Sequence, residues 1–481
     1  MCGIVGYTGN KSVVDILVDG LKQLEYRGYD SSGIAVKVKD DVKVYKAEGK
    51  LENLCKVLSS HKSEYQDATC GIGHIRWATH GAPTVINAHP HTCTCGHLAI
   101  VHNGIIENYK ELRERLTAEG CVFRSQTDTE VAAHLVARKY AQTKDLTEAV
   151  RLAAQELEGA YALCVLHNDY KNTIVATKRN APLLVGVGEG EFYAASDVPA
   201  IIKHTNKAMY LNDNEIVTLT PEKMTLINSD GMEIPMKIET LPWEPVALSK
   251  MGYKHFMLKE IHEQPDVIRN ILVGKLHAPD ENIVLNEVKL TKDSLKNLHR
   301  IQIIACGTSL HAAMCGKYLI ENFCGIPVDV EASSEYIYRK TVTDKHTLVI
   351  GVSQSGETAD TLTAIKQSKE KGSHILIITN RPDSAMARLA DSLISVNAGI
   401  EVSVAATKSY IAQLMAFYLL ALYMAEVKES VDKDVLTSLK AEMMLLPQKL
   451  ERILSNTEDI QKCARAYAGT KDFIYMHWKG H

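Results

Sequence analysis

The spacing of hydrophobic positions divides the chain into two halves with different patterns. In the first half, apolar or alternating segments of strand length occur at 34–38, 42–47, 160–166, 173–176 and 183–186. Helical spacing occurs at 12–24 and 131–140. Many strands with few helices between them are typical of layered α+β domains. The first half is therefore predicted to form a sandwich of sheets and helices.

The second half alternates strands with helices. Apolar runs at 301–305 and 347–352 are each followed by a polar loop and a segment of helical spacing, and a further strand is expected at 375–379. This order predicts an α/β domain with a parallel, doubly wound sheet, whose ligands bind outside the carboxyl ends of the strands. The apolar stretch 414–425 is too short to cross a bilayer and is expected to be a buried helix.

Composition narrows the classes of function. The chain has 481 residues, of which 46% are hydrophobic, and its length allows about two to four domains. A net charge of −4 argues against a nucleic-acid or membrane-surface partner. Eleven cysteines without framework spacing, and an N-terminus without the features of a signal peptide, predict reduced thiols and a cytoplasmic location.

The N-terminus combines two reactive groups in one residue. Cys2 follows Met1 and precedes the short apolar run 3–6. After removal of Met1, Cys2 would carry both a thiol and a free α-amine, whose ordinary pKa is about 8. The thiolate is a nucleophile, and the amine can accept its proton. The alternative is a core strand that merely begins with a cysteine.

Other polar positions offer groups for substrate binding. Arg76, at the end of a predicted strand, can clamp a carboxylate by two parallel hydrogen bonds, unless it is a surface residue. Asn103 and Gly104, at another predicted strand end, provide a side-chain amide and an unobstructed backbone N–H, the donors that an oxyanion requires, unless they form an ordinary turn. Asp128 could bind a substrate ammonium group; otherwise it or Thr127 caps the helix that follows.

The segment 87–102 raises the question of a metal site. Its potential ligands are His89, His91, Cys93, Cys95, His97 and His102. Zinc sites usually separate paired cysteines by at least two residues, whereas Cys93 and Cys95 are separated by one. The sequence therefore predicts no metal here, and it predicts no cofactor elsewhere.

Two polar loops of the second half, 306–309 and 353–358, directly precede predicted helices. Free N–H groups and the positive end of a helix attract phosphate, and the hydroxyl groups of these loops add donors. The glycine motifs of nucleotide-binding loops are missing from the chain. Taken singly each loop could be a helix cap, but together they predict a small phosphorylated ligand.

Six motifs in register resemble the class II glutamine amidotransferase domain, an N-terminal-nucleophile hydrolase fold with an αββα sandwich. They lie at 1–6, 26–31, 76–81, 87–91, 102–104 and 127–130. The resemblance implies that Cys2 attacks the side-chain amide of glutamine and that Asn103 and Gly104 form the oxyanion hole. The glutamine-binding residues that it implies are Arg76, Thr79, His80 and Asp128.

The two loops of the second half resemble the sugar isomerase (SIS) domain. A class II glutaminase joined to an SIS domain through a segment such as 259–265 resembles the glutamine–fructose-6-phosphate aminotransferase (isomerizing) family, over nearly the whole chain. This resemblance implies that ammonia passes through an internal channel gated by Trp77 and converts fructose 6-phosphate into glucosamine 6-phosphate. It also implies L-glutamine and fructose 6-phosphate as substrates, no nucleic-acid or membrane partner, and a homodimer at full length.

The resemblance also assigns sugar-phosphate contacts and domain limits. The contacts are Thr308, Ser309, Ser353, Gln354, Ser355, Thr358 and Val404, whereas Ala406 stands where the family often has serine. The domains are 1–240 (class II glutamine amidotransferase), 241–290 (hinge), 291–435 (first SIS domain) and 455–481 (start of an incomplete second SIS domain). The family's catalytic Glu, His and Lys beyond this point have no counterparts, so Lys479 and His481 are not assigned those roles.

The main hypothesis has two alternatives. We expect the chain to be a fragment, or the product of a frameshift or premature stop, or else a natural short form. We expect it to hydrolyse glutamine but to form little glucosamine 6-phosphate. Another class II amidotransferase would need the acidic pyrophosphate loop of a phosphoribosyl amidotransferase or the Ser-Gly-Gly-x-Asp-Ser loop of an asparagine synthetase, and the chain has neither. A non-catalytic sugar-phosphate-binding regulator would not need Cys2 together with Asn103 and Gly104.

Overall fold

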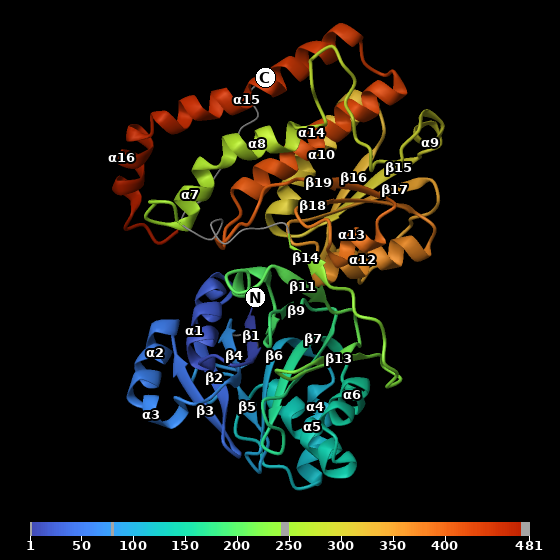
Figure 1. Cartoon of the computed structure of the whole chain (residues 1–481). Coiled ribbons are helices and arrows are strands. Elements are labelled where there is room, and N and C mark those ends of the chain that lie inside the picture. Colours follow the sequence, from blue (N-terminus) through green and yellow to red (C-terminus); the bar gives the residue numbers. More distant parts are fainter. Residues whose placement is uncertain (1, 78–80, 242–249, 473–481) are drawn as a thin grey trace. The chain divides into compact units, whose positions relative to one another are not determined.

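The structure is a computed structural model that describes residues 2–77, 81–241 and 250–472. It contains two compact units, one formed mainly by residues up to 249 and the other mainly by residues from 250 onward (Figure 1). Each unit has its own sheets and its own hydrophobic core.

Two antiparallel sheets form the centre of the first unit. The described strands of the first sheet run in the order β14-β11-β9-β10-β1-β4-β2-β3, and those of the second in the order β13-β12-β8-β7-β6-β5. Their bounds are β1 (Gly3–Thr8), β2 (Ser31–Val38), β3 (Asp41–Glu48), β4 (Cys70–Arg76), β5 (His91–Thr92), β6 (Leu98–Ile106), β7 (Gly159–His167), β8 (Ile174–Arg179), β9 (Leu184–Val187), β10 (Phe192–Ala195), β11 (Lys207–Tyr210), β12 (Ile216–Leu219), β13 (Met224–Ile227) and β14 (Glu239–Thr240).

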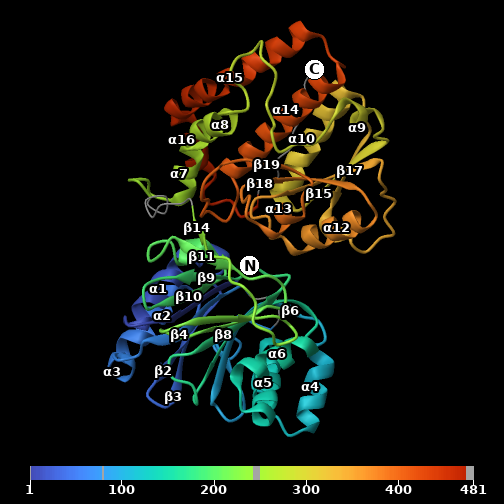
Figure 2. The same ribbon diagram turned by 45° about the vertical axis from the view of Figure 1, so that its right-hand side comes forward.

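Apolar side chains from the two sheets meet in one core. Ile4 and Ile72 of the first sheet and Val101 and Cys164 of the second are fully buried in the same cluster. Helices cover the outer faces, α1 to α3 on the first sheet and α4 to α6 on the second (Figure 2). The helices are α1 (Val13–Gln23), η1 (Glu25–Arg27), α2 (Leu51–Ser60), α3 (Lys62–Tyr65), α4 (Tyr109–Ala118), α5 (Thr129–Thr143), α6 (Leu146–Glu156) and η2 (Val198–Ala200). This is the predicted αββα sandwich.

The second unit contains the predicted parallel sheet. Its described strands run β16-β15-β17-β18-β19, and each neighbouring pair is parallel. The strands are β15 (Arg300–Ala305), β16 (Val328–Ala332), β17 (Thr347–Ser353), β18 (His374–Thr379) and β19 (Ser392–Ser395). The helices are α7 (Phe256–His262), α8 (Gln264–Leu272), α9 (Lys292–Lys296), α10 (Gly307–Cys324), α11 (Ser333–Tyr336), α12 (Ala359–Glu370), α13 (Ala385–Leu389), α14 (Lys408–Lys428), α15 (Lys433–Ser455) and α16 (Glu458–Tyr467).

Helix α14 contains the long apolar stretch of the sequence. Within the described residues it is the one helix whose length and composition would allow it to cross a membrane. Its apolar residues, including the fully buried Phe417 and Leu420, lie in the core of the second unit together with residues of α8, α10 and the sheet. The prediction of a buried helix is confirmed.

Three segments bear on the predicted boundaries. The predicted hinge contains α8, whose Val267, Ile268 and Ile271 are buried in the core of the second unit. The structure describes the segment from 455 only as far as 472, and there α16 has no buried residue. In the first unit, Asn103 and Gly104 lie inside β6, opposite Ala162 and Tyr161 of β7, so the predicted strand end at this point is wrong.

Candidate active site

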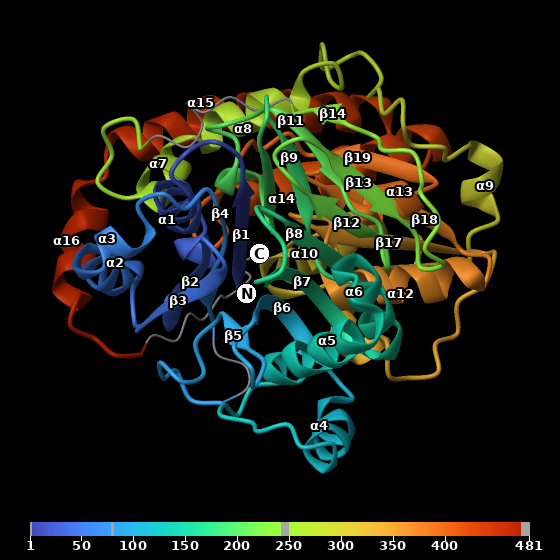
Figure 3. The ribbon, with the colours of Figure 1, turned by 60° about the horizontal axis from the view of Figure 1, so that its bottom comes forward.

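Cys2 lies at the end of the central strand β1. Strands β1 and β4 lie side by side in the sheet (Figure 3). Gly3, the residue after Cys2, pairs with Ile75 of β4, which places Cys2 beside the residues that follow Ile75. The backbone N–H of Trp77 donates to the Cys2 sulfur at 3.3 Å, and the thiol lies 3.5 Å from the Trp77 carbonyl oxygen. The backbone of the neighbouring strand therefore fixes the position of the sulfur.

The surroundings of Cys2 keep its sulfur protonated. Burial raises the pKa of the thiol, while the Trp77 N–H and the positive charges of Arg76 and Arg27 act in the opposite direction without cancelling the effect. A protonated thiol is a poor nucleophile. A reaction at this sulfur therefore needs a base that removes the proton as the new bond forms.

Asn103 reaches the same point from the second sheet. Its side-chain Nδ2 donates to the Cys2 carbonyl oxygen at 3.2 Å, and the side chain is buried. The primary amide carries a second N–H, which this bond does not use. The next residue has a φ of +122°, and a Cβ atom there would lie 2.0 Å from the Ala160 carbonyl oxygen, so only glycine fits at position 104.

Arg76 and Asp128 bring opposite charges to the same part of the first unit. Arg76 is buried and donates to the carbonyl oxygens of Gly81 and Ala82 at 3.2 and 3.1 Å. Burial lowers the pKa of Arg76, and the negative charges of Asp30 and Asp128 oppose this shift. The guanidinium is thus held by neutral carbonyl groups and lies within electrostatic reach of two carboxylates.

The side chains of Asp128 and Thr127 make different contacts at the start of α5. Asp128 makes no side-chain cap bond; instead its Oδ2 accepts the backbone N–H of Ile106 in β6 at 2.9 Å. The Thr127 hydroxyl accepts the Glu130 N–H at 3.4 Å, which is a long cap bond. Asp128 is buried and bonded to β6, so its carboxylate does not cap the N-terminus of α5.

Two further predicted residues, Thr79 and His80, lie outside the described residues. Trp77 is described: its ring is 39% exposed and meets the ring of Tyr29 edge-on, with centroids 5.4 Å apart. The structure therefore brings Cys2, Trp77 and Asn103 into direct contact and places the charge of Arg76 close to the thiol.

The polar loops of the second unit lie at the switch point of its sheet. The chain runs from β15 to β16 on one side and then to β17 on the other side of β15, so the connections diverge between β15 and β17. Ligands of doubly wound sheets bind at such a point. The loop after β15 leads into α10, and the loop after β17 leads into α12. The two loops that the sequence singled out therefore share one edge of the sheet.

The second loop is tightly turned. The Gly356 N–H donates to the Ser353 hydroxyl at 3.0 Å, and Gly356 has a φ of +64°. A Cβ atom at Gly356 would lie 2.0 Å from Ser384 Oγ, so the turn requires glycine. Thr308 is exposed and Ser309 is buried in the first turn of α10, and Val404 is 67% exposed in the loop before α14. The structure thus places Ser309 and Ser353 at the two loops of the switch point.

Comparison with known proteins identifies both units. The glutamine amidotransferase domain family matches residues 40–242, and the SIS domain family matches residues 294–423. The glutamine–fructose-6-phosphate aminotransferase (isomerizing) of Clostridium tetani is 44% identical over 99% of this chain and 77% of its own length. That of Gloeobacter violaceus is 46% identical over the same shares. The chain belongs to the glutamine–fructose-6-phosphate aminotransferase (isomerizing) family.

Among solved structures, the C-terminal domain of the Francisella tularensis glucosamine–fructose-6-phosphate aminotransferase is 35% identical. The match covers 46% of this chain and 61% of that structure, with a TM-score of 0.43. The family assignment itself depends on the two full-chain relatives above.

The first unit also has a buried histidine network beside Cys2, whose role was not predicted from the sequence. The His74 ring stacks on His89, with centroids 4.0 Å apart and planes 14° apart. His89 accepts the backbone N–H of His102 at 3.3 Å, and its other ring nitrogen lies 3.3 Å from the Thr129 hydroxyl. Burial lowers the pKa of His74 to about 3 and that of His89 well below its ordinary value. These rings are therefore neutral parts of the scaffold.

Glu130 is a charged residue close to the histidine network. Its carboxylate accepts the backbone N–H groups of Arg124 and Ser125 at 2.8 and 2.6 Å and the Ser125 hydroxyl at 2.7 Å. Burial alone would raise its pKa, but these donors and His134 outweigh burial and lower the pKa to about 2. Glu130 thus anchors the loop that carries Asp128 into the site.

The cysteines of the histidine-rich segment form a pair of their own. Cys93 is buried at the end of β5 and Cys95 is exposed, and their sulfur atoms lie 2.8 Å apart as free thiols. Burial and the neighbouring thiol raise the pKa of Cys93 to about 11. Their separation by a single residue in the sequence is the local signal that could have indicated this proximity.

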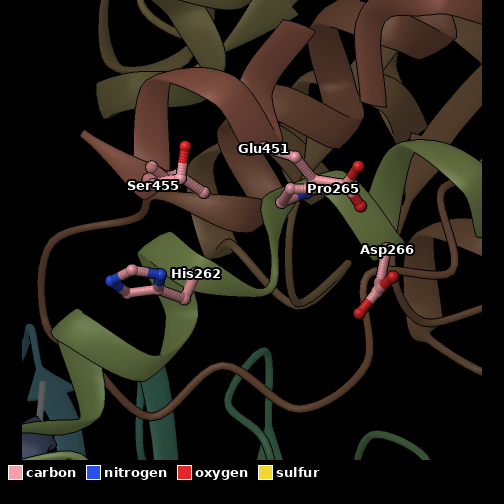
Figure 4. A pocket seen from close by; sticks show the side chains of 6 residues that line it. His262, Pro265, Asp266, Glu451 and Ser455 are labelled. Carbon is pink, nitrogen blue, oxygen red and sulfur yellow. The ribbon is translucent and has the colours of Figure 1, made fainter. Parts of the chain in front are cut away.

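A hollow in the second unit lies away from the predicted site residues. His262, Pro265 and Asp266 of α7 and α8 line it together with Glu451 and Ser455 at the end of α15 (Figure 4). Arg269 pairs with both acidic residues, at 2.7 Å from Asp266, and joins α8 to α15. The acidic groups of this hollow are therefore part of an ion-pair network between two helices.

Proposed function

We propose that this chain hydrolyses L-glutamine with Cys2 as the nucleophile, which is the half-reaction that supplies ammonia to fructose 6-phosphate in the glutamine–fructose-6-phosphate aminotransferase family. The observation that carries the proposal is the meeting of Cys2, the Trp77 N–H and the Asn103 amide at one end of β1. The names of the two relatives support glutamine and fructose 6-phosphate as substrates. A regulator without catalysis would not need a buried thiol beside an amide donor.

The proposed reaction begins with the α-amine of Cys2, freed by removal of Met1. The amine takes the thiol proton as the sulfur attacks the side-chain carbonyl carbon of glutamine. The resulting oxyanion is stabilised by the second N–H of Asn103 and the backbone N–H of Gly104. The amine returns the proton to the departing ammonia, and water then hydrolyses the thioester to glutamate.

The proposed glutamine-binding groups match the two ends of an amino acid. The guanidinium of Arg76 would bind the α-carboxylate, together with Thr79 and His80, and Asp128 would bind the α-ammonium group. Arg76 and Asp128 are both buried, and the charge of one acts on the other. A zwitterionic amino acid carries one group of opposite charge for each of these two side chains.

In the second unit we assign the sugar-phosphate site to the switch point. The phosphate would be bound by the hydroxyl and amide groups of the two loops, with Thr308 and Val404 at the sugar. The proposed phosphate ligands are Ser309, Ser353, Gln354, Ser355 and Thr358. Trp77 is proposed as the gate for ammonia. The proposed product of ammonia transfer is glucosamine 6-phosphate. The proposed location is the cytoplasm, and the proposed full-length assembly is a homodimer.

The glutaminase proposal is tested by ammonia release from glutamine. Mass spectrometry should show that Met1 has been removed, and Cys2→Ala should abolish ammonia release. Cys55→Ser, a change at another partly exposed cysteine of the first unit, should leave the rate unchanged. Full activity of Cys2→Ala, or of a chain that retains Met1, would refute the role of Cys2.

The sugar-phosphate site is tested separately by thermal shift with fructose 6-phosphate. Ser353→Ala should reduce the shift, because the Ser353 hydroxyl holds the turn of the loop by accepting the Gly356 N–H. Ser430→Ala, a change at an exposed serine after α14, is the matched control. An unchanged thermal shift with fructose 6-phosphate in Ser353→Ala would contradict the assignment of the sugar-phosphate site. Formation of glucosamine 6-phosphate is measured in parallel with ammonia release.

A further inference from the structure

His74 connects the central strands of the first sheet to Asn103 of the second sheet. It lies on β4 between Ile4 of β1 and Gly33 of β2, and its side chain is fully buried. Its ring nitrogen Nε2 lies 2.9 Å from the His102 carbonyl oxygen and 3.1 Å from Asn103 Oδ1. One nitrogen of one ring therefore contacts both residues that precede Gly104.

The contact with the carbonyl group determines where the proton of His74 lies. A backbone carbonyl oxygen only accepts hydrogen bonds, so Nε2 of His74 must carry the hydrogen. The other ring nitrogen, Nδ1, is buried and has no hydrogen-bond partner among the described residues, as expected for an unprotonated nitrogen. His74 is thus a neutral ring with a single donor.

This donor decides which way the Asn103 amide faces. With Nε2–H as its neighbour, Asn103 turns its oxygen toward His74 and its NH₂ group toward Cys2, where Nδ2 donates to the Cys2 carbonyl oxygen. The reversed amide would place NH₂ against the Nε2–H donor and oxygen against the Cys2 carbonyl oxygen. Both contacts would then be repulsive.

The ring of His74 is itself held in place. It is stacked on His89, whose Nδ1 accepts the backbone N–H of His102. Because Nδ1 of His89 is an acceptor, Nε2 of this neutral ring carries the hydrogen and donates to the Thr129 hydroxyl. The hydroxyl in turn donates to Nδ1 of His102 at 2.9 Å. The chain of bonds has one direction and fixes the His89 ring on which His74 is stacked.

We propose that His74 is a positioning residue for glutamine hydrolysis: through its Nε2–H it holds the Asn103 amide with the NH₂ group toward Cys2. The inference rests on the proposed function, in which Asn103 supplies an oxyanion donor. His74 touches neither the thiol nor the substrate, and it acts only through Asn103.

The test compares substitutions that keep or remove the donor. In His74→Gln the side-chain NH₂ can replace the imidazole N–H, whereas His74→Leu has a similar size and no donor. Loss of one oxyanion donor lowers kcat by about 100- to 1,000-fold, and an amide free to turn should lose part of this, about 10- to 100-fold. We expect that loss in kcat for His74→Leu with KM changed less than about 3-fold, and recovery of most of it in His74→Gln.

A double-mutant cycle separates positioning from a general structural role. If His74 acts through Asn103, His74→Leu should lower kcat in the parent chain but not in the Asn103→Ala background. A structural role would lower kcat in both backgrounds, and that result would overturn the proposal, as would a parent-like kcat in His74→Leu. His74→Met, which also lacks a donor, replaces the leucine variant should the latter not fold.

Failure of the proposed function gives a different result. If Cys2 is not the nucleophile, Cys2→Ala retains ammonia release, and the role of His74 falls with it. If Cys2 is the nucleophile, its alkylation by iodoacetamide should proceed at similar rates in the parent chain and in His74→Leu, because this reaction forms no oxyanion. Equal alkylation with reduced kcat supports the proposal; equal alkylation with parent-like kcat refutes it for His74 alone.

Discussion

Replacement of His74 by glutamine should make the first unit less sensitive to acid. The folded-state pKa of His74 is lowered to about 3 by burial, below the unfolded value of about 6.5. The unfolded chain therefore binds a proton that the folded chain does not, and acid favours unfolding. The stability due to the neutral ring is fully present above about pH 6.5 and is lost as the pH falls toward 3.

The size of the effect follows from the two pKa values. At pH 5, protonation stabilises the unfolded imidazole by about 2 kcal/mol, whereas the folded ring is still neutral. The value depends little on the folded pKa as long as it lies below about 4. Between about pH 6 and 4 the free energy of unfolding should fall by about 1.4 kcal/mol per pH unit for this one ring.

The assay is urea unfolding of the full chain at pH 7.5, 6 and 5, followed at Cys164. This residue is fully buried in β7, so a brief methanethiosulfonate pulse modifies it only when the first unit opens. Pulses are calibrated on the urea-unfolded chain at each pH. Relative to the parent chain, His74→Gln should gain about 2 kcal/mol of stability between pH 7.5 and 5, since glutamine does not titrate.

The control for this experiment is His97→Gln, at an exposed histidine of the β5–β6 turn. This variant makes the same change of residue type at a position that is not buried. Parallel curves for His74→Gln and the parent chain would refute the reasoning, because they would show that His74 takes up its proton equally in the folded and unfolded states.

Three further changes have expected outcomes. Gly104→Ala should destabilise the first unit by several kcal/mol and abolish ammonia release, since the new Cβ would lie 2.0 Å from the Ala160 carbonyl oxygen; urea unfolding and a glutaminase assay measure both. Glu130→Gln should lose about 3 kcal/mol at pH 7, a difference that fades as the pH falls from about 4.5 to 2, because the folded-state pKa of the carboxylate is the lower one. Oxidised glutathione should convert Cys93 and Cys95 into a disulfide, detected by peptide mass spectrometry as a loss of about 2 Da and prevented by Cys95→Ser.

The layers of both units could be predicted from the sequence because they depend on local periodicity. Alternating runs gave the sandwich, and the strand–loop–helix repeat gave the parallel sheet and its ligand-binding edge. The prediction failed at Asn103 and Gly104, where an Asn-Gly pair is a strong local turn signal. Pairing with Ala162 and Tyr161 of β7 overrides that local preference and keeps both residues in β6.

The geometry of the candidate site could not be derived from local patterns. Cys2 meets Trp77 because β1 and β4 are neighbours in one sheet, and it meets Asn103 because β6 of the other sheet packs against them. Such contacts span 75 and 101 residues of sequence. Only the resemblance to class II glutaminases placed these residues together, and it assigned no role to His74.

The acid sensitivity and the positioning role of His74 have the same physical origin. Nε2 can donate to Asn103 at any pH, but a proton on Nδ1 would be buried without an acceptor among the described residues. Burial therefore keeps the His74 ring neutral and its stack with His89 intact. Because only the unfolded chain can protonate this ring without burying the added charge, acid stabilises the unfolded state. His74→Gln separates the two effects, since it keeps a donor and cannot titrate. A variant that gains stability at pH 5 but loses kcat as severely as His74→Leu would show that the ring itself, rather than its N–H group, orients Asn103.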